Sequence, residues 1–390
     1  MYRFRHALLF CLFSYSFSTF CLAQEVITFT NVTANGGVSV DKDGNIFIAH
    51  FGPLPPNPSI GKDIYKITPT GEVSLFVDNA LNVGSGNAID ADGFMYQSNF
   101  ATGAIYKIAP DGTVVDNNYA NVAGPVGITV GSDNSLYICS CNQNQIKKVS
   151  PTGAITTFAS GSVFNCANGI TQDTIGNLYT TNFSDGRITK VTPDGTTSTL
   201  GSTPAGNGHP VYRAADDALY IASYSGQQIF RMDMTGNVEL FAGTGASGIT
   251  NAVNPLQATF SKPNGINISN DDCTLYISQD GNVLRAILFN DGNCGVSDVE
   301  SIEQHPNFKV YPNPVVHTLH VEYDGDLRFI NVQLIDGQGR KVKNIPVEAG
   351  STSLKIDVAA LTASIYTLYL QSEENKAYTY RFIKPFLKDQ

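Results

Sequence analysis

Asparagines and histidines recur at equivalent positions of a repeated pattern along much of the chain, and one aspartate joins them. Together these side chains could bind a small polar ligand. An asparagine side chain both donates and accepts hydrogen bonds, so several that converge on one point could hold hydroxyl or carbonyl groups. The candidate binding residues are His50, Asn87, Asn99, Asn168, Asn182, His209, Asn264 and Asp280. Nearby aromatic residues, Phe51, Phe100, Phe183 and Tyr224, could stack on a ring of the ligand. The competing interpretation is that asparagine favours turns and strand ends, and that these residues only line a wet channel.

Other residues that commonly do chemistry are sparse. His50 and His209 could approach one another, but two histidines without a carboxylate or cysteine partner make a poor metal site. The sequence has no Gly-x-Ser-x-Gly motif or phosphate loop, and Cys139-Ser140-Cys141 lacks the two-residue gap of redox and zinc motifs. The acids of the repeated turns are better explained as turn formers that bond to their own backbone. These acids are Asp41, Asp43, Asp90, Asp92, Asp133, Asp173, Asp216, Asp271 and Asp272.

The elements that would position these residues form a repeat. A short strand, a turn of Asp, Gly and Asn, and a second strand with an apolar-aromatic pair recur six times, at intervals of 41 to 56 residues. The second strands are expected to start at residues 46, 95, 136, 178, 219 and 275. Four antiparallel strands at a period of about 40–45 residues are typical of a β-propeller blade. The sequence therefore predicts an all-β protein with a six-bladed β-propeller over residues 24–295.

The ring of blades should close through the N-terminal strand. The sixth unit lacks an obvious fourth strand, and residues 25–30 are similar to the fourth strands of other units, so they should complete blade six. In such a blade the start of the first strand and the end of the second lie on one face. The candidate binding residues should then ring the mouth of the central channel, where a convergent polar pocket is the default binding site.

Five cysteines remain after the N-terminal segment, and in an oxidising compartment they are expected to form disulfides. Cys273 and Cys294 should both lie on the face opposite the mouth and pair, which would stabilise the last blade by roughly 3 kcal/mol in the chain-entropy model. Cys141 and Cys166 should meet at the mouth on neighbouring blades. Cys139 is then left unpaired and buried.

The units resemble those of NHL-repeat and SMP-30/gluconolactonase-type six-bladed propellers. Residues 242–245 and Ser261-Lys262-Pro263-Asn264-Gly265-Ile266 are similar to the long inter-blade connection of NHL repeats. Residues 186–195, of the form Gly-x-Ile-x-Lys-Val-Thr-Pro-Asp-Gly, also resemble virginiamycin B lyase-like propellers. That second resemblance implies seven blades, one more than the six units counted above.

The gluconolactonase resemblance implies a divalent cation, such as Ca²⁺, held at the mouth by a Glu, an Asn and an Asp that together polarise a lactone carbonyl. Asn168 and Asn264 match the Asn-Gly pattern, but the Glu position falls on Gly36 and the Asp position on His209. Asp280 is then the one carboxylate near the mouth, and a single carboxylate with amides binds a hard cation weakly. A metal-dependent lactonase is therefore the less favoured alternative.

The first 23 residues predict a signal peptide. Arg3 and Arg5 precede an apolar run over residues 7–20, and Cys21-Leu22-Ala23 places small residues where signal peptidase cleaves. No later run reaches the roughly 20 apolar residues of a membrane span. The formal net charge of −10 becomes −12 without Arg3 and Arg5, which disfavours binding to nucleic acid or anionic lipid.

Beyond a polar linker over residues 296–308, period-2 strands and Gly turns predict a small C-terminal β-sandwich. Its motifs, in chain order, are Tyr311-Pro312-Asn313-Pro314, Asp336-x-x-Gly339, Asp357-Val358-x-x-Leu361 and Ile365-Tyr366. This order resembles the type A C-terminal sorting domain of the type IX secretion system of Bacteroidetes, although Ser364 stands where that family usually has Gly. For residues 309–390 the resemblance implies recognition by the secretion machinery, cleavage, and release or surface anchoring of the propeller.

The sequence favours a binding or scaffold module over an enzyme, because the fold resemblance is good while the catalytic acids of the resembling enzymes are missing. The ligand at the mouth would be a carbohydrate, another small molecule or a protein. A protein-interaction platform of NHL type would instead use the outer faces of the blades. We expect the chain to pass through the periplasm and to be secreted or held at the cell surface.

Overall fold

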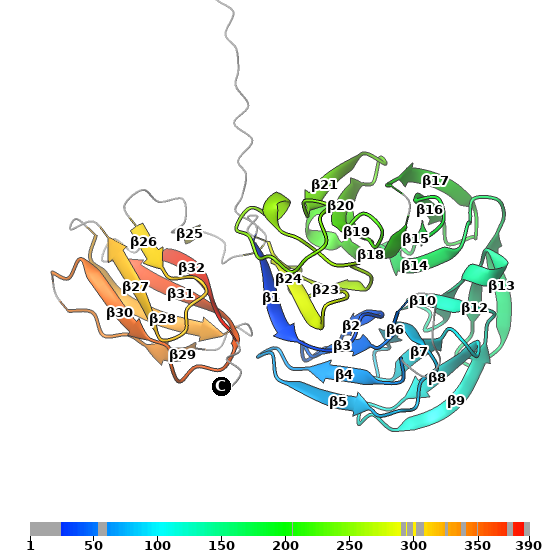
Figure 1. Ribbon diagram of the computed structural model, residues 1–390, viewed down its shortest axis with the longest axis horizontal. Coiled ribbons are helices and arrows are strands. Elements are labelled where there is room, and N and C mark those ends of the chain that lie inside the picture. The colour runs from blue at the N-terminus through cyan, green and yellow to red at the C-terminus, as the bar shows by residue number, and fades with distance from the viewer. Residues whose placement is uncertain are drawn as a thin grey trace, which may run out of the picture.

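The computed structural model describes residues 25–53, 61–204, 206–289, 294, 299–301, 308–323, 327–336, 341–348, 350–372 and 377–385. Almost all of the regular structure is β-strand (Figure 1). The predicted signal peptide and most of the predicted linker lie outside the described residues. Helices in the described part are the short 3₁₀ turns η1 (Cys141–Gln143), η2 (Ala214–Asp216) and η3 (Pro255–Gln257), and none of them could span a membrane.

Within the described residues, six sheets of four antiparallel strands follow one another round a central axis (Figure 1). The first three sheets contain β2 (Val38–Val40), β3 (Ile46–Ala49), β4 (Ile64–Ile67) and β5 (Val73–Val77); β6 (Gly84–Ile89), β7 (Met95–Asn99), β8 (Ala104–Ile108) and β9 (Val114–Asn121); β10 (Pro125–Val130), β11 (Leu136–Ser140), β12 (Gln145–Val149) and β13 (Ile155–Ser160). The next two contain β14 (Ala167–Gln172), β15 (Leu178–Asn182), β16 (Arg187–Val191) and β17 (Thr197–Ser202); β18 (Asn207–Arg213), β19 (Ala218–Ser223), β20 (Gln228–Asp233) and β21 (Val238–Ala242). The last contains β22 (Ile266–Ile268), β23 (Thr274–Ser278), β24 (Val283–Leu288) and β1 (Glu25–Asn31).

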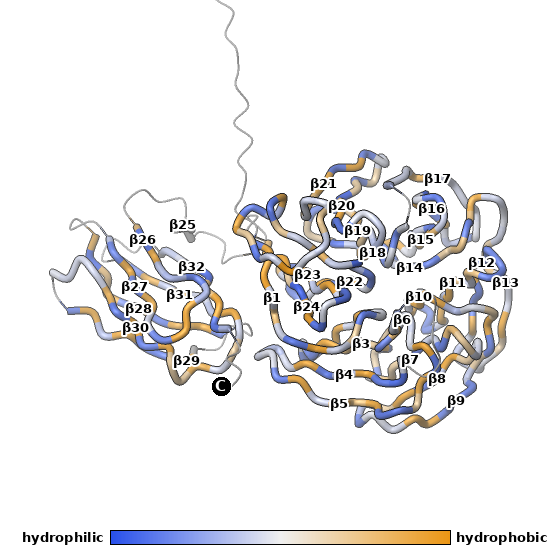
Figure 2. Tube along the Cα trace, viewed as in Figure 1, coloured by the Kyte–Doolittle hydropathy of each residue, from blue (hydrophilic) through white to orange (hydrophobic). Residues whose placement is uncertain are grey.

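The sheets are stable because each packs its faces against its neighbours. The second strands show this clearly, since every residue of β7, β11 and β15 is buried. Between the third and fourth sheets, for example, Cys139 and Ile146 pack in one cluster with Ala167 and Leu178. Hydrophobic and hydrophilic residues are interleaved along the strands, as period-2 alternation requires (Figure 2). A single four-stranded sheet could not bury both faces in this way.

The N-terminal strand β1 closes the ring, as the sequence predicts. It pairs antiparallel with β24, and Val26 lies opposite Ile287. The outer edge of β1 is also covered, because the backbone groups of Val26 and Ala252 exchange hydrogen bonds of 2.9 and 3.0 Å. The connection before the last sheet therefore protects an edge that would otherwise be open to pairing.

Arg285 of β24 ties the closing strand to this connection. Its side chain is fully buried, and its guanidinium donates to the backbone oxygens of Ile27 (3.1 Å), Thr259 (2.7 Å) and Thr250 (3.0 Å). The guanidinium carbon lies 5.2 Å from the centre of the Phe260 ring. Burial lowers the pKa of Arg285 to about 10, so the group stays charged at neutral pH. A buried cation held by carbonyls and a ring thus joins β1 to the rest of the sheet.

The C-terminal part of the chain forms two further sheets. The larger has the order β25 (Val299–Ser301), β32 (Ala377–Lys384), β31 (Ser364–Ser372), β28 (Phe329–Asp336) and β29 (Lys341–Asn344), and the smaller has β26 (Phe308–Tyr311), β27 (Thr318–Tyr323) and β30 (Ser353–Asp357). Val321 and Ile356 of the smaller sheet share one hydrophobic core with Leu334, Leu368 and Phe382 of the larger. This part lies at the rim of the ring, next to β1 and β4 (Figure 1).

The cysteines pair as the predicted topology requires. Cys141 is bonded to Cys166, and Cys273 is bonded to Cys294. Cys139 is a buried free thiol, and burial raises its pKa. The first bond joins η1 to the segment before β14, while the second joins the first turn of the last sheet to the chain beyond β24.

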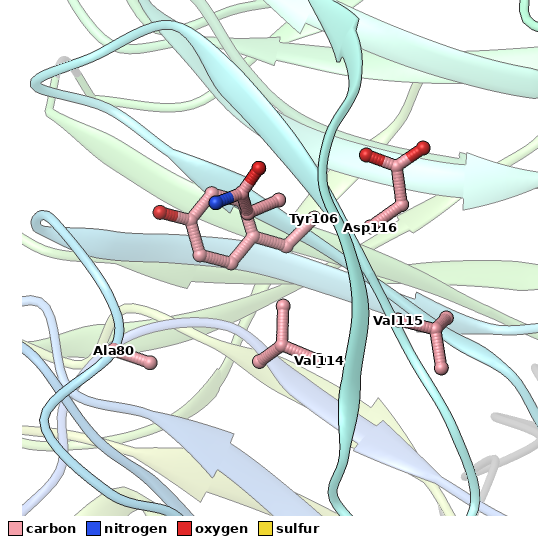
Figure 3. Close-up of a pocket in the computed structure, with 6 residues that line it drawn as sticks. Ala80, Tyr106, Val114, Val115 and Asp116 are labelled. Atoms are coloured by element: carbon pink, nitrogen blue, oxygen red, sulfur yellow. The ribbon is translucent and has the colours of Figure 1, made fainter.

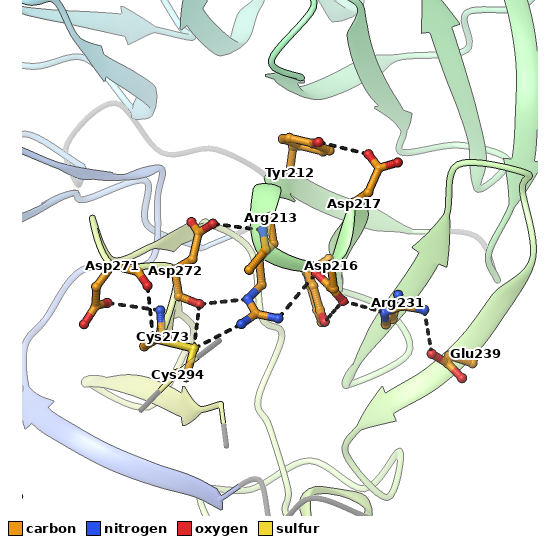
Figure 4. Close-up of polar contacts among 12 residues, drawn as sticks. Tyr212, Arg213, Asp216, Asp217, Arg231, Glu239, Asp271, Asp272, Cys273 and Cys294 are labelled. Carbon is orange, nitrogen blue, oxygen red and sulfur yellow. Dashed lines mark hydrogen bonds and ion pairs between the residues drawn. A yellow bond between two sulfur atoms is a disulfide. The ribbon is translucent and has the colours of Figure 1, made fainter. Parts of the chain in front are cut away.

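The second disulfide lies against the buried side chain of Arg213 (Figure 4). Arg213 donates from Nε to the carbonyl oxygen of Asp272 at 2.8 Å and from Nη2 to Sγ of Cys294 at 3.1 Å. Its Nη1 lies 3.4 Å from a carboxylate oxygen of Asp216, and its guanidinium carbon lies 3.9 Å from the centre of the Phe289 ring. Arg213 therefore connects the fifth sheet to both ends of this disulfide.

Candidate ligand-binding mouth of the channel

The residues just beyond the second strands gather at one end of the channel, which is called the mouth. They are Phe51, Phe100, Cys141, Phe183, Tyr224 and Asp280. The ring centres of Phe51 and Phe100 are 6.1 Å apart, and those of Phe183 and Tyr224 are 6.0 Å apart. The first pair comes from the first and second sheets and the second pair from the fourth and fifth. In a ring of six sheets these two aromatic pairs lie on opposite sides of the mouth.

A polar cluster lies between the aromatic pairs. One carboxylate oxygen of Asp280 accepts from Nδ2 of Asn35 at 2.7 Å, and the other lies 3.2 Å from Nζ of Lys262. Nζ of Lys262 is also 5.8 Å from the centre of the Tyr224 ring. Burial raises the pKa of Tyr224, and the nearby Lys262 opposes that shift. The mouth therefore offers a neutral ion pair beside an aromatic ring.

Asn35 and Lys262 are binding candidates that the sequence interpretation missed. Asn35 directly precedes Gly36, and Lys262 lies in the long connection that resembles NHL repeats. Asn35 and Asp280 are separated by 245 residues and meet because the first and last sheets are adjacent after ring closure. Their place beside the Asn-Gly positions is the signal that could have identified them.

Asn168 and Asn264 connect neighbouring sheets through their amide groups. Nδ2 of Asn168 donates to the carbonyl oxygen of Asn207 in the next sheet at 2.7 Å. Nδ2 of Asn264 donates to the carbonyl oxygen of Asn35, across the closure of the ring, at 2.8 Å. These two asparagines therefore hold the inner strands together, each through one N–H of its amide group.

Asn99 and Asn182 are fully buried and brace loops at the mouth. Oδ1 of Asn99 accepts from the backbone N–H of Asn82 at 2.9 Å, and its Nδ2 donates to the carbonyl oxygen of Ala104 at 3.2 Å. Nδ2 of Asn182 donates to the carbonyl oxygen of Val163 at 2.8 Å. Both side chains support the mouth from below and do not contact its open space.

His50 lies half-buried at the end of β3. Burial lowers the pKa of its imidazole, and the carboxylate of Asp63 partly opposes this shift. His50 directly follows the second strand β3, at the mouth, whereas His209 lies two residues beyond Asn207, the residue of β18 that pairs with the end of its own second strand at Ser223. The two histidines therefore lie at different levels of the channel.

Close packing round the axis reveals a register that differs from the expected one. The innermost strands pack glycine on glycine: a Cβ on Gly37 would lie 2.6 Å from Cα of Gly86, and one on Gly127 would lie 2.7 Å from Cα of Gly169. A Cβ on Gly169 would lie 2.5 Å from Cα of His209. His209 thus occupies the position that glycine holds in the other five sheets, whose members are Gly37, Gly86, Gly127, Gly169 and Gly265.

This register corrects two of the sequence-based positions. His209 was expected at the position of Asn264, but it takes the position of Gly265, one residue further along. Asn87 was also expected at the level of Asn264. Its pairing with Gln97 matches the pairing of Ile266 with Ile277, so Asn87 occupies the position of Ile266, two residues further along. The glycine that precedes Asn87 made the pattern ambiguous, since the residue types alone allow both alignments.

His209 closes the channel below the mouth. A Cβ on Gly86 would lie 3.2 Å from Cε1 of His209, although the two residues belong to sheets three places apart in the ring. The imidazole therefore reaches across the axis. The side chain is buried, and burial lowers its pKa to about 4, so it is neutral at pH 7. An uncharged imidazole therefore lies across the channel below the mouth.

Beyond His209 the channel widens into a cavity of about 220 Å³. Its lining includes Ser39, Asn87, Thr129, Thr171 and His209, all from innermost strands. These residues lie at or after the glycine level in their strands, so the cavity is on the side away from the mouth.

Several acids of the first turns bond to their own turn, as expected from their residue type, but Asp216 pairs with Arg213 and Arg231, and Asp272 accepts from the backbone N–H of Ala215. Oδ1 of Asp41 accepts from the backbone N–H groups of Asp43 and Asn45 at 2.9 and 2.8 Å, and Asp173 bonds in the same way to Ile175 and Asn177. Among the described residues, no group of three or more His, Cys, Asp or Glu side chains could hold a metal ion.

A second hollow, of about 490 Å³, lies on the outer rim (Figure 3). Ala80, from the connection after β5, lines it together with Tyr106 of β8 and Val114, Val115 and Asp116 of β9. Its lining has one aromatic ring and one carboxylate, and so does not repeat the paired rings and the ion pair of the mouth.

The ring of four-stranded antiparallel sheets around a channel defines this protein as a β-propeller protein. Residues 58–287 match the virginiamycin B lyase family, and the chain belongs to that family. Residues 309–385 match the secretion system C-terminal sorting domain, which implies export to the cell surface or beyond and the secretion machinery as a partner. A comparison with curated protein sequences finds no match.

Solved structures agree with the fold. A virginiamycin B lyase from Staphylococcus aureus is 18% identical with a TM-score of 0.51, over 68% of this chain and 99% of that chain. An auxiliary nutrient binding protein from Bacteroides thetaiotaomicron is 15% identical with a TM-score of 0.57, over 69% and 77% of the two chains. A gluconolactonase from Xanthomonas campestris is 14% identical with a TM-score of 0.52, over 67% and 89%. At these identities the likeness shows the fold alone.

Proposed function

We propose that this protein is an exported binding module that takes a small ligand at the mouth of its propeller. The observation that carries the proposal is the arrangement of two aromatic pairs on opposite sides of the channel mouth, with Asp280, Lys262 and Asn35 between them. Ring faces and a few placed polar groups are what a sugar or similar polar ring needs for stacking and hydrogen bonding. The similarity to a nutrient binding protein supports the same kind of role.

In this proposal the chain has four parts. A signal peptide over residues 1–23 directs the chain to the periplasm, and a six-bladed propeller follows over residues 24–295, with β1 as the outer strand of the sixth blade. A linker over residues 296–308 leads to a β-sandwich sorting domain over residues 309–390. Six four-stranded sheets and a separate C-terminal core support this division.

The proposal is tested by binding measurements on the mature chain with a panel of neutral oligosaccharides. We expect calorimetry to detect a binder, and Phe183→Ala or Tyr224→Ala to weaken it by about tenfold or more, because each loses a stacking surface. Tyr106→Ala, which removes an aromatic ring from the outer rim, is the matched control and should bind normally. Binding that survives Phe183→Ala and Tyr224→Ala but is lost in Tyr106→Ala would favour a protein-interaction platform that uses the outer faces of the blades.

The alternative function is a metal-dependent lactonase or related hydrolase, which the similarity to a gluconolactonase favours. Asn168, Asn264 and Asp280 would hold a divalent cation such as Ca²⁺. These residues fit poorly, because their one carboxylate, that of Asp280, already pairs with Lys262 and accepts a hydrogen bond from Asn35. Assays on a lactone panel with Ca²⁺, Zn²⁺ and Mn²⁺ distinguish the two functions. Metal-stimulated turnover that disappears in Asp280→Ala would overturn the binding-module proposal.

A further inference from the structure

Two isoleucines on the larger C-terminal sheet pack against the propeller. Ile365 of β31 lies directly opposite Ile383 of β32. Their chain neighbours Tyr366 and Phe382 point into the core of the C-terminal domain, so the isoleucines lie on the other face of the sheet. Ile383 is only 5% exposed and belongs to a hydrophobic cluster made of propeller residues. An apolar pair outside its own domain's core is therefore covered by the other domain.

The surface that receives this pair lies where the ring closes. It is called the seam and consists of β1, β24 and the hairpin tip at residues 69–71. The cluster that includes Ile383 contains Ile27 of β1 and Leu288 of β24, with Phe29 and Ile365 packed against it. The seam joins the N-terminal strand to the last and first sheets, so it exists as a surface only after β1 has paired with β24.

Two hydrogen bonds orient the contact. Oγ of Ser364 donates to the carbonyl oxygen of Pro69 at 3.2 Å, and Nη1 of Arg381 donates to the carbonyl oxygen of Phe289 at 3.3 Å. Ser364 is the residue that departs from the glycine usual in the sorting-domain pattern, and its hydroxyl reaches the propeller. The C-terminal domain lies beside the rim and not over the centre of the ring, so it leaves the channel uncovered (Figure 1).

The Tyr-Pro-Asn-Pro motif supports the docking strand from behind. Nδ2 of Asn313 donates to the carbonyl oxygen of Arg381 at 3.2 Å, and its Oδ1 accepts from the backbone N–H of Ile383 at 2.9 Å. The backbone N–H of Val315 donates to the carbonyl oxygen of Ile383 at 2.8 Å. The motif therefore holds the end of β32 in the position from which Ile383 and Arg381 contact the propeller.

We propose that the sorting domain docks on the seam through Ile365, Ile383, Ser364 and Arg381, and that docking and closure of the ring stabilise one another. Coupling between two equilibria is reciprocal. If docking needs a closed seam, then the docked domain must in turn stabilise the pairing of β1 with β24. The sorting domain is thus held in place only on a folded propeller, while the mouth stays open to ligand.

Hydrogen exchange on the mature full-length chain tests this coupling. In the double variant Ile365→Asp/Ile383→Asp we expect the backbone amides of β1 to exchange about tenfold faster, which corresponds to about 1.4 kcal/mol. Amides in the core of the C-terminal domain, such as those of β27, should stay protected. Ile330→Asp is the matched control, because Ile330 is 61% exposed on the same C-terminal sheet and should leave β1 unchanged.

Equal exchange of β1 in the double variant and in Ile330→Asp, with the C-terminal core still protected, overturns the proposal. If the double variant loses protection throughout the C-terminal domain, Ser364→Gly decides instead, since it restores the residue usual in the family and removes the hydroxyl that bonds to Pro69. A two- to threefold faster exchange of β1 in Ser364→Gly supports the coupling. Unchanged exchange in that variant overturns it.

Discussion

His209 is the residue at which the symmetry of the inner ring is broken. Five sheets place glycine at this level, and the sixth side chain fills the space the glycines leave. An imidazole in that space reaches across the axis towards Gly86 and is kept neutral by burial, which lowers its pKa from 6.5 to about 4. The same residue therefore closes the channel and makes folding sensitive to acid.

The sign of this pH effect follows from proton binding. Between pH 4 and 6.5 the unfolded chain binds a proton at His209 that the folded chain does not, so stability falls as the pH falls through this window. From pH 7 to pH 5 the contribution to the unfolding free energy is about 2 kcal/mol. The unfolding free energy of each protein is measured in denaturant at pH 7 and at pH 5. Between these pH values we expect the unfolding free energy of His209→Gln to fall by about 2 kcal/mol less than that of the unsubstituted protein. An equal loss in the two proteins would contradict the assigned burial.

At the scale of elements, the closing strand β1 depends on Arg285. Replacing it in Arg285→Met removes the donor to the buried carbonyl of Ile27 and to the part-buried carbonyls of Thr250 and Thr259. We expect the unfolding free energy to fall by about 3 kcal/mol, measured by circular dichroism in denaturant.

Arg187→Met is the control for Arg285→Met. Arg187 pairs with Asp185 at the surface, and both side chains are partly exposed, so the loss should stay below about 1 kcal/mol. Similar losses in the two variants would mean that β1 is held by its strand pairing alone.

For the whole molecule, the sorting domain and the propeller have separate tasks. Deleting residues 309–390 should leave the chain in the periplasm, because the C-terminal domain carries the export address. Full-length Phe183→Ala should be exported normally, since it alters only the mouth. The measurement is the fraction of each protein in periplasm, cell surface and medium, and equal amounts of the truncated and full-length chains outside the cell would refute the assignment.

The sequence by itself determined the repeat and most of its strands. The second strands begin at Ile46, Met95, Leu136 and Leu178, as predicted, and the other two begin one residue earlier than expected. The disulfide partners also followed from the sequence. The physical reason is that strand alternation and turn chemistry are local, so a short stretch decides which way a side chain points and at which face a strand ends.

Only the tertiary structure decided what meets across the channel and across the seam. The imidazole of His209 lies against a sheet three places away, Asn35 reaches Asp280 over 245 residues, and Ser364 reaches Pro69 over 295. Asn168 and Asn264, which the sequence offered as ligand-binding residues, each donate a hydrogen bond from Nδ2 to a neighbouring sheet. Such contacts depend on how closely the sheets approach round the axis and on where the second domain packs. No local pattern encodes that geometry, because it arises when separate elements share one buried surface.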